Sequence, residues 1–195
     1  MSTLIIPCLG RKMMNGIPQY LNHHPNGELL LERSVKGIFA SEYDKVFIVL
    51  LREDVEKYYA DQVIKEELKD YPIEIFCLDK MTSGPAETIF CTIKEKEISG
   101  TVVIKDADNY LTTDTIPKGN FVAGLDLNTW ERDMHNLRNK SFLIVNEQGN
   151  LLDIIEKKIR SEVICLGLYG FKRAEDFVKA YEKLNDESYP ISSLY

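Results

Sequence analysis

The chain has 195 residues, of which 44% are hydrophobic and 28% charged, and its net charge at pH 7 is −7. This length suits one domain with a full hydrophobic core. The acidic balance argues against a nucleic-acid-binding protein, which would normally carry a basic face. No apolar run approaches the ~20 residues that a membrane span needs, and the start of the chain lacks the basic region of a secretory signal. We therefore expect a cytoplasmic protein that binds neither nucleic acid nor membrane.

Strands and helices alternate in the first half of the chain. Short apolar runs rich in β-branched residues predict strands, whereas apolar side chains that recur every three or four residues predict helices. In chain order we expect a strand at 4–8, a helix with Leu31, Val35, Ile38 and Phe39 on one face, a strand at 45–51, a helix at about 53–68, a strand at 73–78, a helix that begins near Pro85, and a strand within 101–108. Repeated strand–helix units of this kind form a mainly parallel sheet between two layers of helices.

The second half is richer in strands. Segments at 120–126, 141–145, 151–156 and 163–171 are expected strands, and 173–184 is an expected helix. The second and third of these strands flank a turn-rich segment and predict a hairpin. We expect this half to pack on the parallel core and to form the second wall of a cleft. The sequence thus predicts one domain, 1–195, with a three-layer α/β/α, Rossmann-like fold and a mixed, mainly parallel sheet.

The cysteines and histidines do not suggest a metal centre. All four cysteines lie inside apolar segments and none has the C-x-x-C spacing of a zinc or redox site, which predicts reduced core residues. The three histidines are too few and too scattered for a metal cluster.

Two acids follow the fourth strand directly. Ligands of open α/β sheets bind beyond the carboxyl ends of such strands, and Asp106 and Asp108 lie there. Two carboxylates suit Mg²⁺, which prefers one or two protein carboxylates together with substrate phosphates. A polar turn explains this short motif equally well, because Asp and Asn are common turn residues.

The loop after the first strand combines glycines with cations. Gly10 and Gly16 allow close approach of the backbone to a phosphate, and Arg11 and Lys12 supply charge-assisted hydrogen bonds to it. Spacing alone favours the simpler interpretation of a surface turn with two solvated cations.

Five parts of the chain, in order, resemble the sugar-phosphate nucleotidyltransferases of the GT-A-like α/β fold, and in particular the branch associated with capsular polysaccharides. They are Leu4–Arg11, Pro18–Leu21 with His24–Arg33, Ser83–Thr88, Lys105–Asn109, and Glu156-Lys157 with Gly167–Phe171. The resemblance covers almost the entire chain, and its specificity comes from the order and spacing of the motifs. It implies transfer of a nucleoside monophosphate from an NTP to a phosphorylated small-molecule acceptor, with Mg²⁺ as cofactor and release of pyrophosphate.

The resemblance also implies roles for individual residues. Asp108 is the expected main ligand of Mg²⁺ and Asp106 the second, while Arg11, with Lys12 as helper, would stabilise the leaving phosphates. The loops around the base and ribose would include Gly10, Gly84 and Glu87. For Glu87, an acid stabilised by the dipole of its own helix is the alternative. On the acceptor side the implied residues are Glu156 for hydroxyl groups, Lys157 for the phosphate, and Gly167 for close approach of the acceptor.

Two departures from the family pattern leave questions open. The family's Pro-Lys is Pro18-Gln19 here, which removes one positive charge. Either Lys12 substitutes for this charge, or activity is weak. The segment ending at Tyr195 resembles the start of one that normally continues to a second metal-binding acid, so the chain either needs only the two aspartates or is part of a longer polypeptide.

The substrates also stay open at this point. A sugar 1-phosphate is the commonest acceptor of the family, with phosphocholine or another small phosphorylated compound as the alternative, and CTP is mildly favoured over the other NTPs. Other hypotheses are a GT-A glycosyltransferase that uses a nucleotide sugar and a nucleotide-binding relative without catalysis. Homodimers are frequent in the family, and the oligomeric state of this chain is open.

Overall fold

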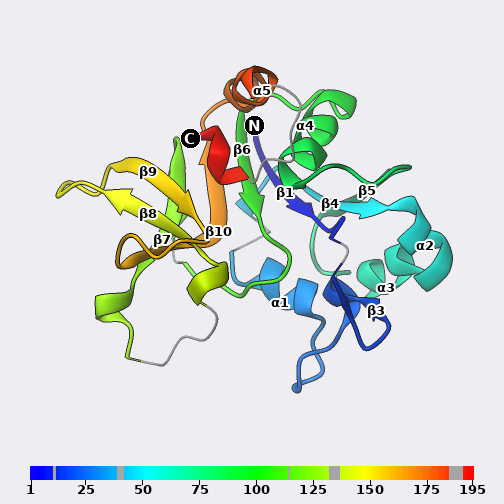
Figure 1. Ribbon diagram of the computed structural model, residues 1–195. Coiled ribbons are helices and arrows are strands. Elements are labelled where there is room, and N and C mark those ends of the chain that lie inside the picture. Colours follow the sequence, from blue (N-terminus) through cyan, green and yellow to red (C-terminus); the bar gives the residue numbers. More distant parts are fainter. Residues whose placement is uncertain (11, 39–41, 114, 132–136, 185–190) are drawn as a thin grey trace.

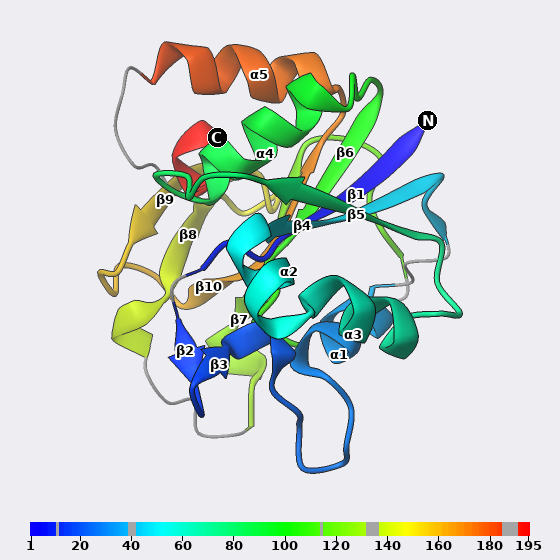
Figure 2. The same cartoon turned by 90° about the vertical axis from the view of Figure 1, so that its right-hand side faces the viewer.

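The structure is a computed structural model that describes residues 1–10, 12–38, 42–113, 115–131, 137–184 and 191–195. A central eight-stranded sheet lies between two layers of helices (Figures 1 and 2). The sheet contains β1 (Ser2–Pro7), β4 (Lys45–Leu51), β5 (Ile73–Leu78), β6 (Thr101–Lys105), β7 (Phe121–Asp126), β8 (Ser141–Val145), β9 (Leu151–Glu156) and β10 (Val163–Phe171). The helices are α1 (Leu30–Lys36), α2 (Arg52–Tyr58), α3 (Ala60–Glu67), α4 (Pro85–Glu95) and α5 (Ala174–Lys183).

The strand order is β5-β4-β1-β6-β10-β8-β9, and β7 also pairs with β10. The first four strands are parallel to one another. From β10 onward every pairing is antiparallel, including the predicted hairpin of β8 and β9. The predicted mixed sheet with a parallel core is therefore confirmed. The second half of the chain continues this sheet, because β10 pairs with β6, and residues such as Leu143 and Phe171 share a buried cluster with Ile5 of the parallel part.

Each face of the parallel strands carries its own hydrophobic core. Successive side chains of a strand point to opposite faces, so Leu4 and Ile6 pack toward α1 and α3, whereas Ile5 packs toward α4 and α5. All three side chains are fully buried. Burial of each such side chain stabilises the fold by roughly 1.5–3 kcal/mol. Burial on both faces also explains why the strands are continuous apolar runs rather than alternating ones.

The predicted helix at 53–68 is wrong in one respect, because the chain breaks at Tyr59 into α2 and α3. Tyr59 has the left-handed backbone angle φ +53° and is 62% exposed. The break turns α3 so that Ala60 and Ile64 are buried in the core, whereas α2 buries no residue. Tertiary packing thus overrides a continuous helical pattern.

Other segments differ in smaller ways. The loop after β1 contains a short hairpin of β2 (Met13–Met14) and β3 (Ile17–Pro18), whose turn is Asn15-Gly16 with φ of +55° and +80°. Such angles favour an Asn-Gly turn. Phe39, predicted on the buried face of α1, lies outside the described residues. The remaining elements are short 3₁₀ turns: η1 (Gln19–Leu21), η3 (Leu127–Thr129), η4 (Leu137–Asn139) and η5 (Ile191–Leu194).

All four cysteines are free thiols, two of them buried and two partly buried. Among the described residues, no helix has both the length and the apolar character required to cross a bilayer.

Candidate active site

The strand order creates a crevice between β1 and β6. From β1 the chain moves outward to β4 and β5, and then returns to place β6 on the other side of β1. Ligands of open α/β sheets bind at such a reversal, beyond the carboxyl ends of the strands. The loops that leave β1 and β6 meet here, because Lys12 Nζ lies 3.6 Å from Asp108 Oδ2. Two residues predicted from separate motifs are therefore neighbours.

Asp108 is the accessible acid of this crevice. Its side chain is 50% exposed and that of Lys12 is 70% exposed, so their ion pair adds little to stability. An exposed carboxylate beside an exposed ammonium can instead exchange its partner for a metal ion or a phosphate-bearing ligand. Arg11, the predicted main phosphate contact, lies outside the described residues.

Asp106 is the shielded acid. Its backbone N–H donates to the carbonyl of Gly167 (2.8 Å), and the side chain lies against the same glycine. A Cβ at position 167 would lie 2.2 Å from Asp106 Oδ2, and Gly167 has φ +67°. Burial raises the pKa of Asp106 from 3.8 to about 6, although the nearby Lys105 ammonium acts in the opposite direction. Glycine at 167 thus makes room for the acid itself, a contact that the sequence pattern did not indicate.

Lys105 is a functional candidate that the sequence analysis missed. It is the last residue of β6 and is completely buried. Its ammonium donates to the backbone carbonyls of Asp106 (2.7 Å) and Asn109 (2.8 Å) and to Ser34 Oγ (3.1 Å), and it also contacts Asn109 Oδ1. Burial lowers its pKa from 10.5 to about 8, opposed by the two aspartates. A lysine at the end of a buried strand was the available signal, since a buried lysine requires partners.

The two aspartates fit a magnesium ion that is shared with substrate. The described residues contain no group of three or more His, Cys, Asp or Glu side chains that could hold a metal by itself. Two carboxylates without further protein ligands match the preference of Mg²⁺ for phosphate oxygens and water in the remaining positions. Asp106 and Asp108 would hold such an ion.

A cavity of about 560 Å³ lies on the β1 side of the crevice and brings together the two predicted glycine loops. Its lining includes Gly10 from the first loop and Gly84 from the second. Glu87 does not line it, because its carboxylate accepts hydrogen bonds from the backbone N–H (2.5 Å) and hydroxyl (2.6 Å) of Ser83. Glu87 therefore fixes the loop before α4. This structural role is similar to the alternative prediction, in which Glu87 is an acid at the N-terminus of its own helix.

A larger cavity of about 790 Å³ lies on the other side of the crevice. Asn109 and Lys140 line it together with a largely apolar wall that includes Trp130. Lys140 forms no ion pair within the described part of the chain, and its charge acts on Asp106. Lys140 comes just before β8 and carried no signal in the sequence.

The predicted acceptor residues lie at the end of the β8–β9 hairpin. Glu156 accepts a hydrogen bond from Ser141 Oγ (2.7 Å) and is close enough to Asp106 to raise its pKa. Lys157 is exposed, has φ +53°, and donates its backbone N–H to the carbonyl of Lys140 (3.1 Å). The structure thus brings Lys157 beside Lys140, and Glu156 into the neighbourhood of Asp106.

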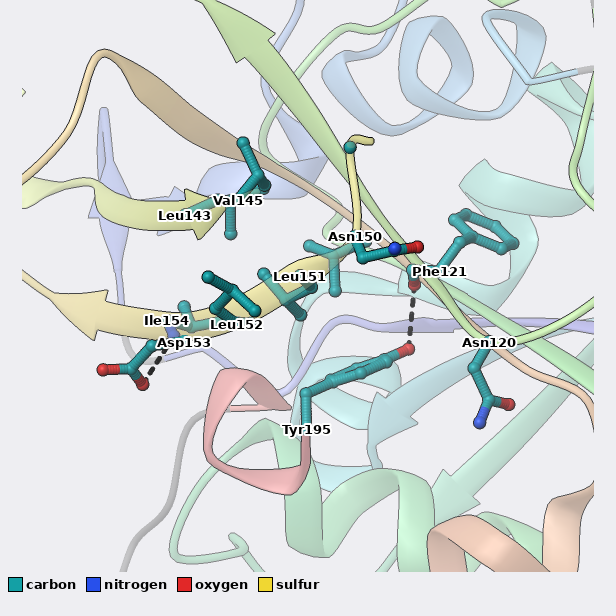
Figure 3. Close-up of a pocket in the computed structure, with 12 residues that line it drawn as sticks. Asn120, Phe121, Leu143, Val145, Asn150, Leu151, Leu152, Asp153, Ile154 and Tyr195 are labelled. Atoms are coloured by element: carbon teal, nitrogen blue, oxygen red, sulfur yellow. Dashed lines mark hydrogen bonds between the residues drawn. The ribbon is translucent and has the colours of Figure 1, made fainter. Parts of the chain in front are cut away.

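A third cavity, of about 430 Å³, lies away from these residues, between β7 and the β8–β9 hairpin (Figure 3). The hydroxyl of Tyr195 lies 2.9 Å from the carbonyl oxygen of Phe121 and 2.7 Å from that of Gly170. The lining of this cavity is mainly apolar, and among the described residues Asp153 and Tyr195 are its ionisable side chains. None of the predicted site residues lines it.

Comparison by sequence finds no protein family and no curated protein that matches the chain. Comparison by structure finds clear likenesses. The nucleoside-diphosphate-sugar pyrophosphorylase from Vibrio cholerae RC9 has a TM-score of 0.71 at 18% identity, and the match covers 100% of this chain and 86% of that one. The inositol-1-phosphate CTP transferase from T. maritima has a TM-score of 0.67 at 12% identity, with coverage of 97% and 75%.

The chain has the fold of these two proteins. At such low identity the likeness concerns the path of the backbone, and it confirms the predicted α/β fold class over nearly the whole chain. The roles of individual residues rest on the geometry of the crevice.

Proposed function

We propose that the protein is a nucleotidyltransferase that moves a nucleoside monophosphate from an NTP to a phosphorylated small molecule and releases pyrophosphate. The observation that carries this proposal is the meeting of Lys12 and Asp108 at the crevice between β1 and β6. The cavity lined by Gly10 and Gly84 flanks one side of the crevice, and the cavity lined by Lys140 flanks the other. Two substrates placed in these cavities would meet at the two aspartates.

Charge stabilisation and positioning account for most of the catalysis of such a transfer. Mg²⁺ held by Asp106 and Asp108 would neutralise negative charge on the phosphates. Lys12, together with Arg11, would stabilise the leaving pyrophosphate. The backbone N–H of Gln19 donates to the carbonyl of Lys12 (2.9 Å), so position 19 lies beside Lys12, and the Lys12 side chain can supply the charge that a glutamine lacks.

The NTP would occupy the glycine-lined cavity and the acceptor the larger one. Gly84 ends the loop that Glu87 fixes, and backbone groups there would contact the base and ribose. Lys140 and Lys157 would bind the acceptor phosphate, and Glu156 its hydroxyl groups. CTP is our first choice of nucleotide, supported by the CTP transferase among the structural neighbours.

A sugar 1-phosphate is our first choice of acceptor, since one neighbour is a nucleoside-diphosphate-sugar pyrophosphorylase. Phosphocholine or another small phosphorylated compound is the alternative. The product would then serve the synthesis of capsular or other surface polysaccharides.

The proposal is tested by pyrophosphate release in the presence of Mg²⁺, each of the four NTPs and a panel of phosphorylated acceptors. We expect release only with one NTP and one acceptor class together, and its loss in Asp108→Ala. Asp70→Ala, at an exposed aspartate outside the crevice, is the matched control and should keep full activity. Binding of an NTP without turnover would instead indicate a non-catalytic relative, and turnover of a nucleotide sugar would indicate a glycosyltransferase.

A further inference from the structure

The environment of Lys105 calls for an explanation, because a lysine is almost never fully buried without a charged partner. Its side chain has no exposed surface, and no carboxylate among the described residues forms an ion pair with it. Its contacts are instead four uncharged oxygens: the carbonyls of Asp106 and Asn109, Asn109 Oδ1, and Ser34 Oγ. The ammonium therefore occupies a cage of oxygens, as a small cation would.

Three of these oxygens come from the two ends of one short turn, and the fourth, Ser34 Oγ, comes from α1. The carbonyl of Asp106 begins the turn and the groups of Asn109 end it, so the ammonium closes the turn across Ala107 and Asp108. The turn is also fixed from outside. Ser34 Oγ of α1 donates to the Asp106 carbonyl (3.1 Å), and Asn109 Nδ2 donates to the carbonyl of Leu166 in β10 (2.8 Å).

Both candidate metal ligands belong to this turn, and the metal-binding geometry depends on its shape. Asp106 points toward Gly167, and Asp108 faces Lys12 on the open side. A shift of the turn would move the two carboxylates relative to each other. Ligand orientation by surrounding hydrogen bonds is a general determinant of metal affinity, and loss of such a contact typically weakens binding roughly 10–100-fold.

We propose that Lys105 is a positioning residue that holds the turn of residues 106–109 so that Asp106 and Asp108 present their carboxylates to one divalent cation. This inference rests on the proposed function, since it assumes that the two acids bind Mg²⁺. Lys105 itself would not touch the ion or the substrates, because its ammonium lies inside the protein and is surrounded by oxygens of the turn and of Ser34.

The experiment measures binding of Mn²⁺, a spectroscopic substitute for Mg²⁺, by electron paramagnetic resonance, without nucleotide and in the presence of CTP. Lys105→Met introduces a side chain of similar length without charge, and we expect this variant to bind Mn²⁺ at least tenfold more weakly than the wild type. Ser34→Ala removes one contact to the ammonium and one to the Asp106 carbonyl, and we expect a smaller loss in the same direction. Lys65→Met is the matched control for loss of one lysine, since Lys65 is an exposed residue of α3 paired with Asp61, and it should bind Mn²⁺ like the wild type.

The mutants also separate positioning from general stability. Each melting temperature is measured without metal, and Mn²⁺ affinity is determined well below it. If Lys105→Met and Ser34→Ala both bind Mn²⁺ within twofold of the wild type, the proposal is wrong. If Lys105→Met does not fold, Ser34→Ala decides alone, with unchanged affinity overturning the proposal. If Asp108→Ala also leaves Mn²⁺ binding unchanged, the proposed function itself fails, whereas loss in Asp108→Ala but not in the other two overturns only the role of Lys105.

Discussion

Replacing Asp106 with asparagine should stabilise the protein in the absence of metal. The carboxylate is partly buried, and burial raises its pKa from 3.8 to about 6. Each pKa unit corresponds to about 1.4 kcal/mol, so the ionised acid costs the folded state about 3 kcal/mol at neutral pH. Asparagine has nearly the same shape but carries no charge, although its amide still loses some hydration. We therefore expect Asp106→Asn to raise the free energy of unfolding at pH 7 by about 1–3 kcal/mol.

The pH dependence of this effect follows from the sign of the pKa change. The acid binds its proton more tightly in the folded state, so wild-type stability rises as the pH falls through 6 toward 3.8. Asparagine cannot titrate and lacks this gain. The advantage of Asp106→Asn should therefore shrink below pH 6 and disappear near pH 4.

Urea unfolding of metal-free protein at several pH values provides the measurement. Asp108→Asn is the matched control, because that side chain is 50% exposed and its neutralisation should change stability by no more than about 0.5 kcal/mol. Both variants should lose pyrophosphate release. An Asp106→Asn protein that is no more stable than the wild type at pH 7, or whose advantage is the same at pH 4, would refute the reasoning.

Three further predictions concern the same crevice. In Gly167→Ala, a strained φ of +67° is combined with a 2.2 Å approach of the new Cβ to Asp106 Oδ2, whereas Gly149→Ala has φ +78° but no neighbour within 4 Å. Both variants should lose ~1–2 kcal/mol of stability to backbone strain. In thermal unfolding, Gly167→Ala should lose clearly more than this. Lys140→Met should raise the acceptor KM about tenfold and leave the NTP KM unchanged, since it removes one charge-assisted contact, with Lys118→Met as the neutral control. Mn²⁺ affinity should fall as the pH drops below about 6, because protonation of Asp106 competes with the metal; a flat profile from pH 7 to 5 would exclude Asp106 as a ligand.

The strands were predictable because their signal is local. Fully buried strands require continuous apolar runs, and the bounds of β4, β5, β8, β9 and β10 agree with those predicted from the sequence. The break between α2 and α3 was not predictable, because Tyr59 is an ordinary helical residue and the left-handed turn depends on where Ala60 must pack. The pairing of β10 with β6 was not predicted for a similar reason, since strand pairing is a long-range property.

The candidate site shows the same division between local and long-range information. Asp106 and Asp108 were identified from their place after a strand, and that place follows from the strand order. Lys140 gave no signal, because its position beside the crevice depends on the pairing of β8 with β9 and β10. Lys105 gave a signal that was overlooked: a cation inside a buried strand has to find oxygens, and the turn that follows supplies them.

The charges around the crevice bear on how an acidic protein would bind the two anionic substrates that we propose for it. The net charge of −7 repels phosphates at a distance. Five cations flank the end of the β8–β9 hairpin, and none of them forms an ion pair within the described part of the chain: Arg138, Lys140, Lys157, Lys158 and Arg160. The backbone contact between Lys157 and Lys140 brings the two segments that carry them together. Cations that are not neutralised by acids remain available to bind incoming phosphates. The buried ammonium of Lys105 has a similar electrostatic effect on the two carboxylates. Its positive charge reduces the repulsion between Asp106 and Asp108 before any divalent ion binds.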